Sequence, residues 1–126
     1  MLYAGATSTD NTGRVFRSAN GGQSWEPSEP LGESQAVRAL LAVPTGRLYA
    51  GVDMGPGRFT SYVYASEDGG DTWQDAGFLF MADAAHDLLL TPGGAIYAAS
   101  GDTYGVIFRM WKHHQVYLPL LLRNYK

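Results

Sequence analysis

One short pattern occurs twice in this sequence, first as Ser18-Ala19-Asn20-Gly21-Gly22-Gln23-Ser24-Trp25 and again as Ser66-Glu67-Asp68-Gly69-Gly70-Asp71-Thr72-Trp73. Both copies read S-x-[DN]-G-G-x-[ST]-W, and they begin 48 residues apart. A turn pattern that returns at this period is typical of proteins built from repeated four-stranded antiparallel sheets. The pattern therefore predicts an all-β fold of propeller-type blades whose hairpins carry it.

The residue types in the pattern predict a compact turn. The oxygens of the serine and of Asn20 or Asp68 accept hydrogen bonds from nearby backbone N–H groups, and the paired glycines supply positive φ. The tryptophan is large enough to cover the turn and hold it against the blade. A Ca²⁺ loop at Asp68 and Asp71 is the alternative, although the EF-hand spacing and its terminal glutamate are missing. The positions expected to be structural are Ser18, Asn20, Gly22, Trp25, Ser66, Asp68, Gly70 and Trp73.

The pattern resembles the Asp-box, which is the bacterial neuraminidase repeat of sialidases, sortilin-like receptors and photosystem assembly factors. This resemblance implies that the two turns shape the fold and lie away from any active site. Asn20 departs from the usual aspartate but offers the same kind of acceptor oxygen.

The rest of the chain repeats with the same period, because residues 37–52 align without a gap on residues 85–100. Residues 2–5, 48–51 and 96–99 are three copies of one short segment. We label the strands of a blade A to D from the propeller axis outward. The repeat predicts one domain, residues 1–126, of just under three blades that do not close into a ring within one chain. Blade one (1–30) has B at 2–8, C at 13–18 and D at 24–28; blade two (36–80) has A at 36–43, B at 47–53, C at 60–66 and D at 72–79; blade three (84–112) has A at 84–91, B at 95–100 and C at 105–111.

Blade one lacks an inner strand, and the apolar segment 116–123 resembles one because its leucines do not alternate as those of an outer strand should. We expect this segment to fill the vacant position in blade one of a neighbouring copy, by donor-strand complementation. The result would be a closed oligomer or a filament. Two alternatives stay open: an in-place D strand of blade three, with Pro119 matching Pro27, or a disordered or membrane-seeking tail. The predicted assembly residues are Leu2, Tyr3, Ala4, Leu118, Leu120, Leu121 and Leu122.

Composition narrows the classes of function. The 126 residues carry a net charge of −3 and no basic block, so nucleic-acid binding lacks its electrostatic footprint. No apolar stretch reaches the roughly 18–20 residues that span a bilayer, so we expect no transmembrane segment. The chain has no cysteine, and His113 and His114 have no third ligand nearby, so we predict no metal site and no cofactor. No signal peptide is visible at residues 1–11.

Four residues are candidates for a ligand face that would take a glycan. Arg38 and His86 align near the starts of two inner strands, and Asp53 and Asp102 lie in equivalent B–C loops opposite the turns. A glycosidase needs two carboxylates roughly 5–10 Å apart. The sialidase resemblance also implies an Arg-Ile-Pro element, which this sequence lacks. Ordinary turn and surface roles are the alternative interpretation, and we predict no catalytic residue and no enzyme.

These observations favour a non-enzymatic structural or interaction module, a self-assembling extracellular subunit that forms a homo-oligomer or homopolymer. A fragment of an Asp-box glycosidase or carbohydrate-binding propeller is the alternative. An assembly factor of the photosystem type would require a chain about twice as long and a basic face.

Overall fold

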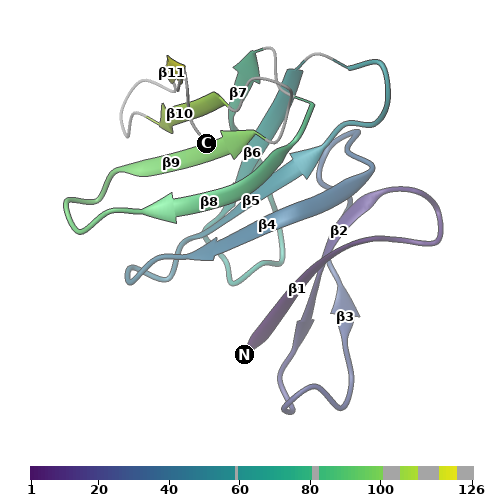
Figure 1. Ribbon diagram of the computed structural model, residues 1–126. Helices are drawn as coiled ribbons and strands as arrows, with labels where there is room; N and C mark the ends of the chain where they lie inside the picture. Colours follow the sequence, from purple (N-terminus) through teal and green to yellow (C-terminus); the bar gives the residue numbers. More distant parts are fainter. Residues whose placement is uncertain (59, 81–82, 101–105, 111–116, 122–126) are drawn as a thin grey trace.

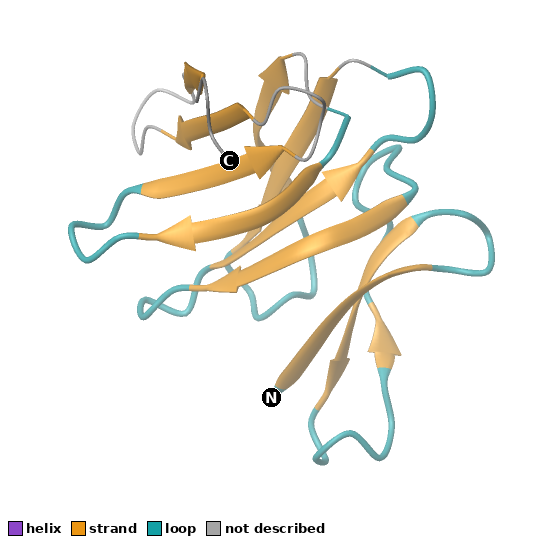
Figure 2. Cartoon of the chain, in the orientation of Figure 1, coloured by secondary structure: helices purple, strands orange, loops and turns teal. Residues whose placement is uncertain are grey.

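The computed structural model describes residues 1–126 except 59, 81–82, 101–105, 111–116 and 122–126. The described part is all-β, with eleven strands in three antiparallel sheets that do not close into a barrel or ring (Figures 1 and 2). The predicted all-β class is therefore confirmed. The first sheet has the strand order β1-β2-β3, the second β4-β5-β6-β7 and the third β8-β9-β10-β11.

The strands follow the expected ranges within two residues at each end. The first sheet contains β1 (Leu2–Thr7), β2 (Gly13–Ser18) and β3 (Glu26–Pro27). The second sheet contains β4 (Ala36–Ala42), β5 (Leu48–Asp53), β6 (Thr60–Ser66) and β7 (Gln74–Phe80). The third sheet contains β8 (Ala85–Leu90), β9 (Ile96–Ser100), β10 (Val106–Met110) and β11 (Tyr117–Leu121).

The hairpins that join the first two strands of the second and third sheets have the same hydrogen bonds. The N–H of Gly46 donates to the Val43 carbonyl over 2.9 Å, and that of Gly94 donates to the Thr91 carbonyl over 3.0 Å. Both glycines have positive φ, 91° and 85°. A β-bulge also recurs in β4 and β8, between residues 37 and 39 and between residues 85 and 87. The sequence repeat is therefore a repeat of backbone geometry.

Two buried clusters hold the three sheets together, because each sheet packs a face against the next. β4 contacts both β1 and β8, and it lies between them in Figure 1. The cluster between the first and second sheets contains Val15, Leu31, Val37, Ala50, Val52, Met54 and Tyr64. The cluster between the second and third sheets contains Tyr49, Val63, Ala65, Ala85, Leu88, Ile96, Ala98 and Phe108.

Close backbone approach between sheets is made possible by glycine at one repeated position. A Cβ added to Gly51 of β5 would lie 2.6 Å from the Ala85 carbonyl oxygen in β8. A Cβ added to Gly5 of β1 would collide with the side chain of Val37 in β4. Val37 and Ala85 are 48 residues apart, so both contacts belong to the same step of the repeat. Any larger residue at Gly5 or Gly51 would force the next sheet outward.

The C-terminal strand does not take the place that we expected. β11 pairs with β10 of its own chain, with Leu118 opposite Arg109 and Leu120 opposite Ile107. This pairing contradicts the predicted donation of Leu118, Leu120 and Leu121 to a neighbouring copy. Leu122 lies outside the described residues.

The physical reasons for this position are the short connection to β10 and the matching prolines of the first and third sheets. Pro119 has no N–H to donate and is tolerated at a sheet edge, which is the position that β11 occupies. The first sheet has the same arrangement, since Pro27 lies opposite Phe16 as Pro119 lies opposite Phe108. Pairing with the preceding strand of the same chain also closes a short loop at low entropic cost. The in-place alternative is the one that agrees with the structure.

Candidate functional site

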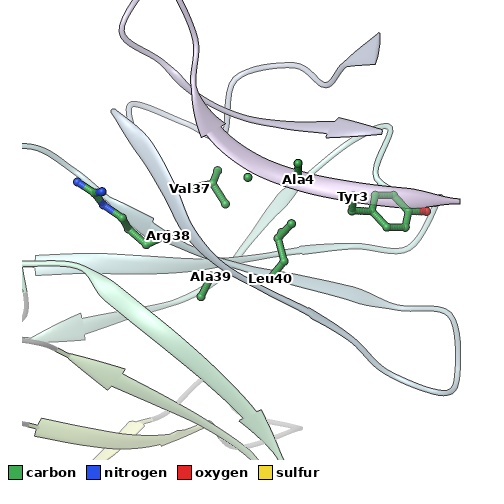
Figure 3. A pocket seen from close by; sticks show the side chains of 7 residues that line it. Tyr3, Ala4, Val37, Arg38, Ala39 and Leu40 are labelled. Atoms are coloured by element: carbon green, nitrogen blue, oxygen red, sulfur yellow. The ribbon is translucent and has the colours of Figure 1, made fainter. Parts of the chain in front are cut away.

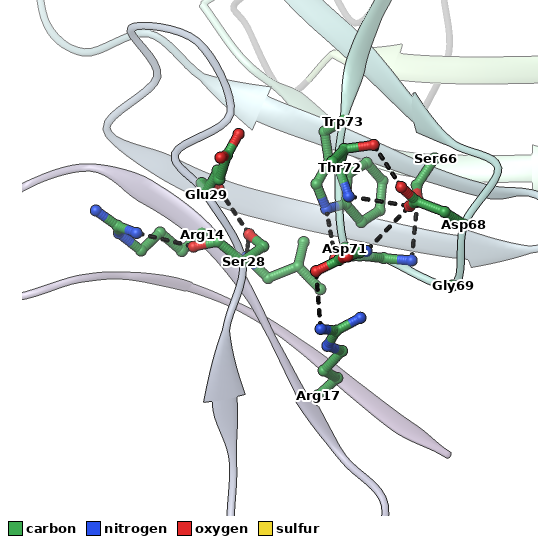
Figure 4. A network of polar contacts seen from close by, with 12 residues as sticks. Arg14, Arg17, Ser28, Glu29, Ser66, Asp68, Gly69, Asp71, Thr72 and Trp73 are labelled. Atoms are coloured by element: carbon green, nitrogen blue, oxygen red, sulfur yellow. Dashed lines mark hydrogen bonds and ion pairs between the residues drawn. The ribbon is translucent and has the colours of Figure 1, made fainter.

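The second S-x-[DN]-G-G-x-[ST]-W turn, residues 66–73, is held by two side chains. The Ser66 hydroxyl accepts a hydrogen bond from the N–H of Gly70 over 2.9 Å and donates to an Asp68 oxygen over 2.8 Å. Asp68 also accepts from the N–H groups of Asp71 (3.1 Å) and Thr72 (2.9 Å), and from the Thr72 hydroxyl (2.5 Å). Figure 4 shows this network beneath Trp73.

The charge of Asp68 is stabilised by the turn that it organises. The hydrogen bond from the Thr72 hydroxyl, followed by those from the Thr72 N–H and from Ser66, holds the pKa of Asp68 far below its ordinary value. The carboxylate is therefore ionised throughout the physiological pH range and acts as an acceptor only. No group of three His, Cys, Asp or Glu side chains that could hold a metal ion occurs within the described residues.

The first turn, residues 18–25, repeats these contacts with an amide. The Ser18 hydroxyl accepts from the N–H of Gly22 over 2.8 Å and donates to Asn20 over 2.9 Å. The Asn20 oxygen accepts from the N–H of Ser24 over 2.9 Å, and its amide donates to the Ser24 hydroxyl over 2.7 Å. Asn20 thus replaces aspartate with the same local geometry.

The two tryptophans make one identical contact but lie in different surroundings. The indole N–H of Trp25 donates to the Gly22 carbonyl and that of Trp73 donates to the Gly70 carbonyl, each over 3.1 Å. Trp73 is half-buried and packs against the cluster between the first two sheets. Trp25 is 40% exposed, which differs from the expectation that both side chains are covered.

The second turn is docked onto the first sheet by two side chains that the sequence analysis did not connect with it. The Tyr3 hydroxyl donates to the Gly69 carbonyl over 3.0 Å. The Arg17 guanidinium forms an ion pair with Asp71 at 2.9 Å, which Figure 4 shows. Tyr3 and Arg17 face each other across β1 and β2. The sequence aligns Tyr3 with Tyr97 and Arg17 with Arg109, but it does not identify the residues that Tyr3 and Arg17 contact.

Among the described strands, only β2 pairs with β1, which leaves one edge of β1 open. The equivalent edges of β5 and β9 in the other two sheets pair with β4 and β8. A shallow groove of about 140 Å³ lies beside this edge, lined by residues 3–5 of β1 and 37–40 of β4. Val37 and Leu40 point toward β1 in Figure 3. The predicted assembly residues Leu2, Tyr3 and Ala4 therefore border an unfilled strand position.

The face of the first sheet that points away from the second sheet is called the open face here. Its residues are exposed where their counterparts are buried. Leu2 is 47% exposed, whereas Leu48 is 6% exposed and Ile96 is 8% exposed. Ala4 is also exposed, whereas Ala50 and Ala98 are fully buried. The open face includes the apolar residues Leu2, Ala4, Phe16 and Trp25, of which Phe16 is half-buried.

Two of the predicted ligand-face residues pair with each other, and a third lies beside a near neighbour in the sequence. The Arg38 guanidinium pairs with Asp53 at 2.9 Å, and Asp53 also accepts from the N–H of Gly55 over 2.8 Å. His86 lies 3.7 Å from Asp83. Asp102 lies outside the described residues, as do His113 and His114.

Comparisons with known proteins add no family to this description. No protein-family model matches the chain, and no curated protein matches it significantly. Among the described residues, no helix is long and apolar enough to cross a membrane.

Proposed function

We propose that this chain is a non-enzymatic structural module that assembles with copies of itself. The observation that carries the proposal is the incomplete first sheet, which has an open β1 edge, an adjacent groove and an exposed apolar face. An unpaired strand edge beside exposed apolar side chains is a surface that associates readily. Full burial of an exposed leucine contributes about 1.5–3 kcal/mol. Leu2 is 47% exposed, so a partner that covers it would gain roughly half of that free energy from this side chain.

The non-enzymatic part of the proposal is supported by how the polar groups are used. The side chains of Ser66, Asp68 and Thr72 form hydrogen bonds within the turn itself. Arg38 and Asp53 form an ion pair with each other. Each of these polar groups thus has a hydrogen-bond or ion-pair partner within the chain.

The propeller-type architecture and the Asp-box identity of the turns belong to the same proposal. They are supported by the 48-residue period, by the recurring bulges in β4 and β8, and by the shared hydrogen bonds of the two turns. We also propose an extracellular location for this subunit.

The self-association is tested by sedimentation velocity over a wide range of protein concentration. We expect the mean mass to rise with concentration. A monomer that persists at millimolar concentration would contradict the proposal.

A second variant tests the role of the incomplete sheet. A copy of residues 84–95 placed before Leu2, in place of Met1, supplies the missing strand in the same chain. We expect this graft to raise the melting temperature and to weaken self-association, because it covers the β1 edge. A control graft with serine at the copy of Leu89, whose counterpart Leu41 packs against the next sheet, should raise the melting temperature less. An unchanged mass distribution with the apolar graft would show that the first sheet is not the assembly surface.

A further inference from the structure

We infer that two copies meet head to tail, with the outer face of the third sheet of one copy against the open face of the next. This inference rests on the proposed self-assembly and names the surface that covers the first sheet. The outer face is the side of the third sheet that points away from the second sheet. This face includes Leu89, Tyr97, Ile107 and Arg109.

The three packed sheets form a stack. The faces at its two ends are built from the same repeat positions as the faces that pack against each other inside the chain. Leu89 is 61% exposed, while Leu41, 48 residues earlier, packs against the cluster between the second and third sheets. Ile107 is half-buried, while its counterpart Val63 is fully buried in that cluster. The outer face is thus a junction surface without its next sheet. The open face lacks a preceding sheet in the same sense, so each end supplies what the other needs.

Polar groups at the two ends match as well. Inside the chain, Tyr3 and Arg17 bind Gly69 and Asp71 of the following turn. Tyr97 and Arg109 of the third sheet stand opposite each other in the same register as Tyr3 and Arg17. In a head-to-tail pair, the sheet next to the third sheet is the first sheet of the second copy. The turn that Tyr97 and Arg109 would contact is therefore the first turn of that copy. Its positions that correspond to Gly69 and Asp71 are Gly21 and Gln23.

This register predicts two contacts between copies. The Tyr97 hydroxyl donates to the Gly21 carbonyl, and the Arg109 guanidinium donates to the Gln23 side-chain oxygen. Because Gln23 is uncharged, the second contact is weaker than the Arg17–Asp71 ion pair. A substitution at Gln23 can therefore strengthen the contact, which allows a test by gain as well as by loss.

Ala99 is compatible with packing against a sheet that lacks its first strand. Gly5 and Gly51 are needed because β4 and β8, the first strands of the next sheets, come very close to them. The third sheet has Ala99 at this position. The first sheet of a second copy has no such strand, so the methyl group of Ala99 meets no backbone there.

The experiment measures the dissociation constant for self-association by sedimentation equilibrium in the full chain. Gln23→Asp should lower the constant about two- to fivefold, the range of an exposed ion pair. The gain should shrink in 1 M salt and disappear when Arg109→Gln is added. Gln74→Asp, the same change at an exposed site in β7, is the matched control and should have no effect.

Leu89→Lys supplies the test by loss. It should raise the dissociation constant about tenfold or more, because it places a charge in an apolar contact. The melting temperature of the monomer should stay unchanged, since Leu89 is 61% exposed. Self-association that responds neither to Gln23→Asp nor to Leu89→Lys would overturn the head-to-tail inference and leave the proposed function standing. A chain that never associates would overturn both.

Discussion

The two S-x-[DN]-G-G-x-[ST]-W turns have nearly the same internal hydrogen bonds and different surroundings. The second turn lies against the first sheet, where Tyr3 and Arg17 hold it and Trp73 joins a buried cluster. In the first turn, Trp25 is 40% exposed. The sequence pattern determines the conformation of each turn, but the neighbouring sheet determines how much the turn contributes to stability.

The largest expected difference between the turns concerns their tryptophans. Trp73→Ala should lower the free energy of unfolding by about 2–3 kcal/mol, somewhat less than for a fully buried aromatic residue. Trp25→Ala should lower it by less than about 1 kcal/mol. Urea unfolding of the monomer measures both values. Equal losses at the two sites would show that the indole acts on its own turn alone.

Removing one hydroxyl group tests the docking of the second turn. Tyr3→Phe deletes the hydrogen bond to the Gly69 carbonyl and should cost about 0.5–1.5 kcal/mol of unfolding free energy. Tyr97→Phe is the matched control at the other end of the stack, and in dilute monomer it should change stability by less than about 0.5 kcal/mol. A loss of the same size in both variants would contradict the assigned role of Tyr3.

The ion pair between Arg17 and Asp71 should contribute less than the hydroxyl. Both side chains are partly exposed, so a double-mutant cycle of Arg17→Gln and Asp71→Asn should give a coupling of about 0.2–1 kcal/mol. The coupling should decrease in 1 M salt. A value that is insensitive to salt would indicate that the residues interact through packing.

Acid should distinguish the turns through Asp68, whose counterpart Asn20 does not titrate. At neutral pH, Asp68→Asn should lower stability only by the extra strength that the charge gives to the hydrogen bonds of the turn, because Asn20 makes equivalent contacts in the first turn. The pKa of Asp68 in the folded protein lies below the ordinary value of 3.8, so its ionised form stabilises the fold above about pH 4. This contribution is lost as the pH falls further toward the folded pKa.

The parent protein should therefore lose stability relative to Asp68→Asn only below about pH 4. Thermal unfolding from pH 7 to pH 2 measures the difference between the two proteins. Asp10, whose pKa is also lowered by Thr12, titrates in both and cancels in the comparison. A constant difference over this range would show that the charge of Asp68 has no role.

Much of the fold could be predicted because the repeat is local. The glycines and prolines of the hairpins, the serines of the turns and the alternation within the strands are all encoded within a few residues. The strand ranges follow from aligning three imperfect copies. The same alignment shows that the first sheet copies β5, β6 and β7 of the second sheet.

The rest depends on contacts between distant residues. The binding of Tyr3 to Gly69 joins residues 66 positions apart, and no local pattern identifies that partner. The position of β11 was a choice between two sheet edges, each compatible with a leucine-rich strand. The leucines alone favoured the wrong edge, whereas the matching positions of Pro27 and Pro119 indicated the right one.

A 48-residue segment of this chain contains four strands, but the four need not belong to one sheet. This has a consequence for how such a chain can change in length. Residues 48–95 contain β5, β6 and β7 of one sheet together with β8 of the next. A duplication of this segment would therefore yield one additional complete sheet, because the copies of β5, β6 and β7 would pair with the β8 that precedes them. The first and last sheets would keep their present sequences. Tandem duplication could thus lengthen the molecule in whole sheets while both terminal surfaces stay the same.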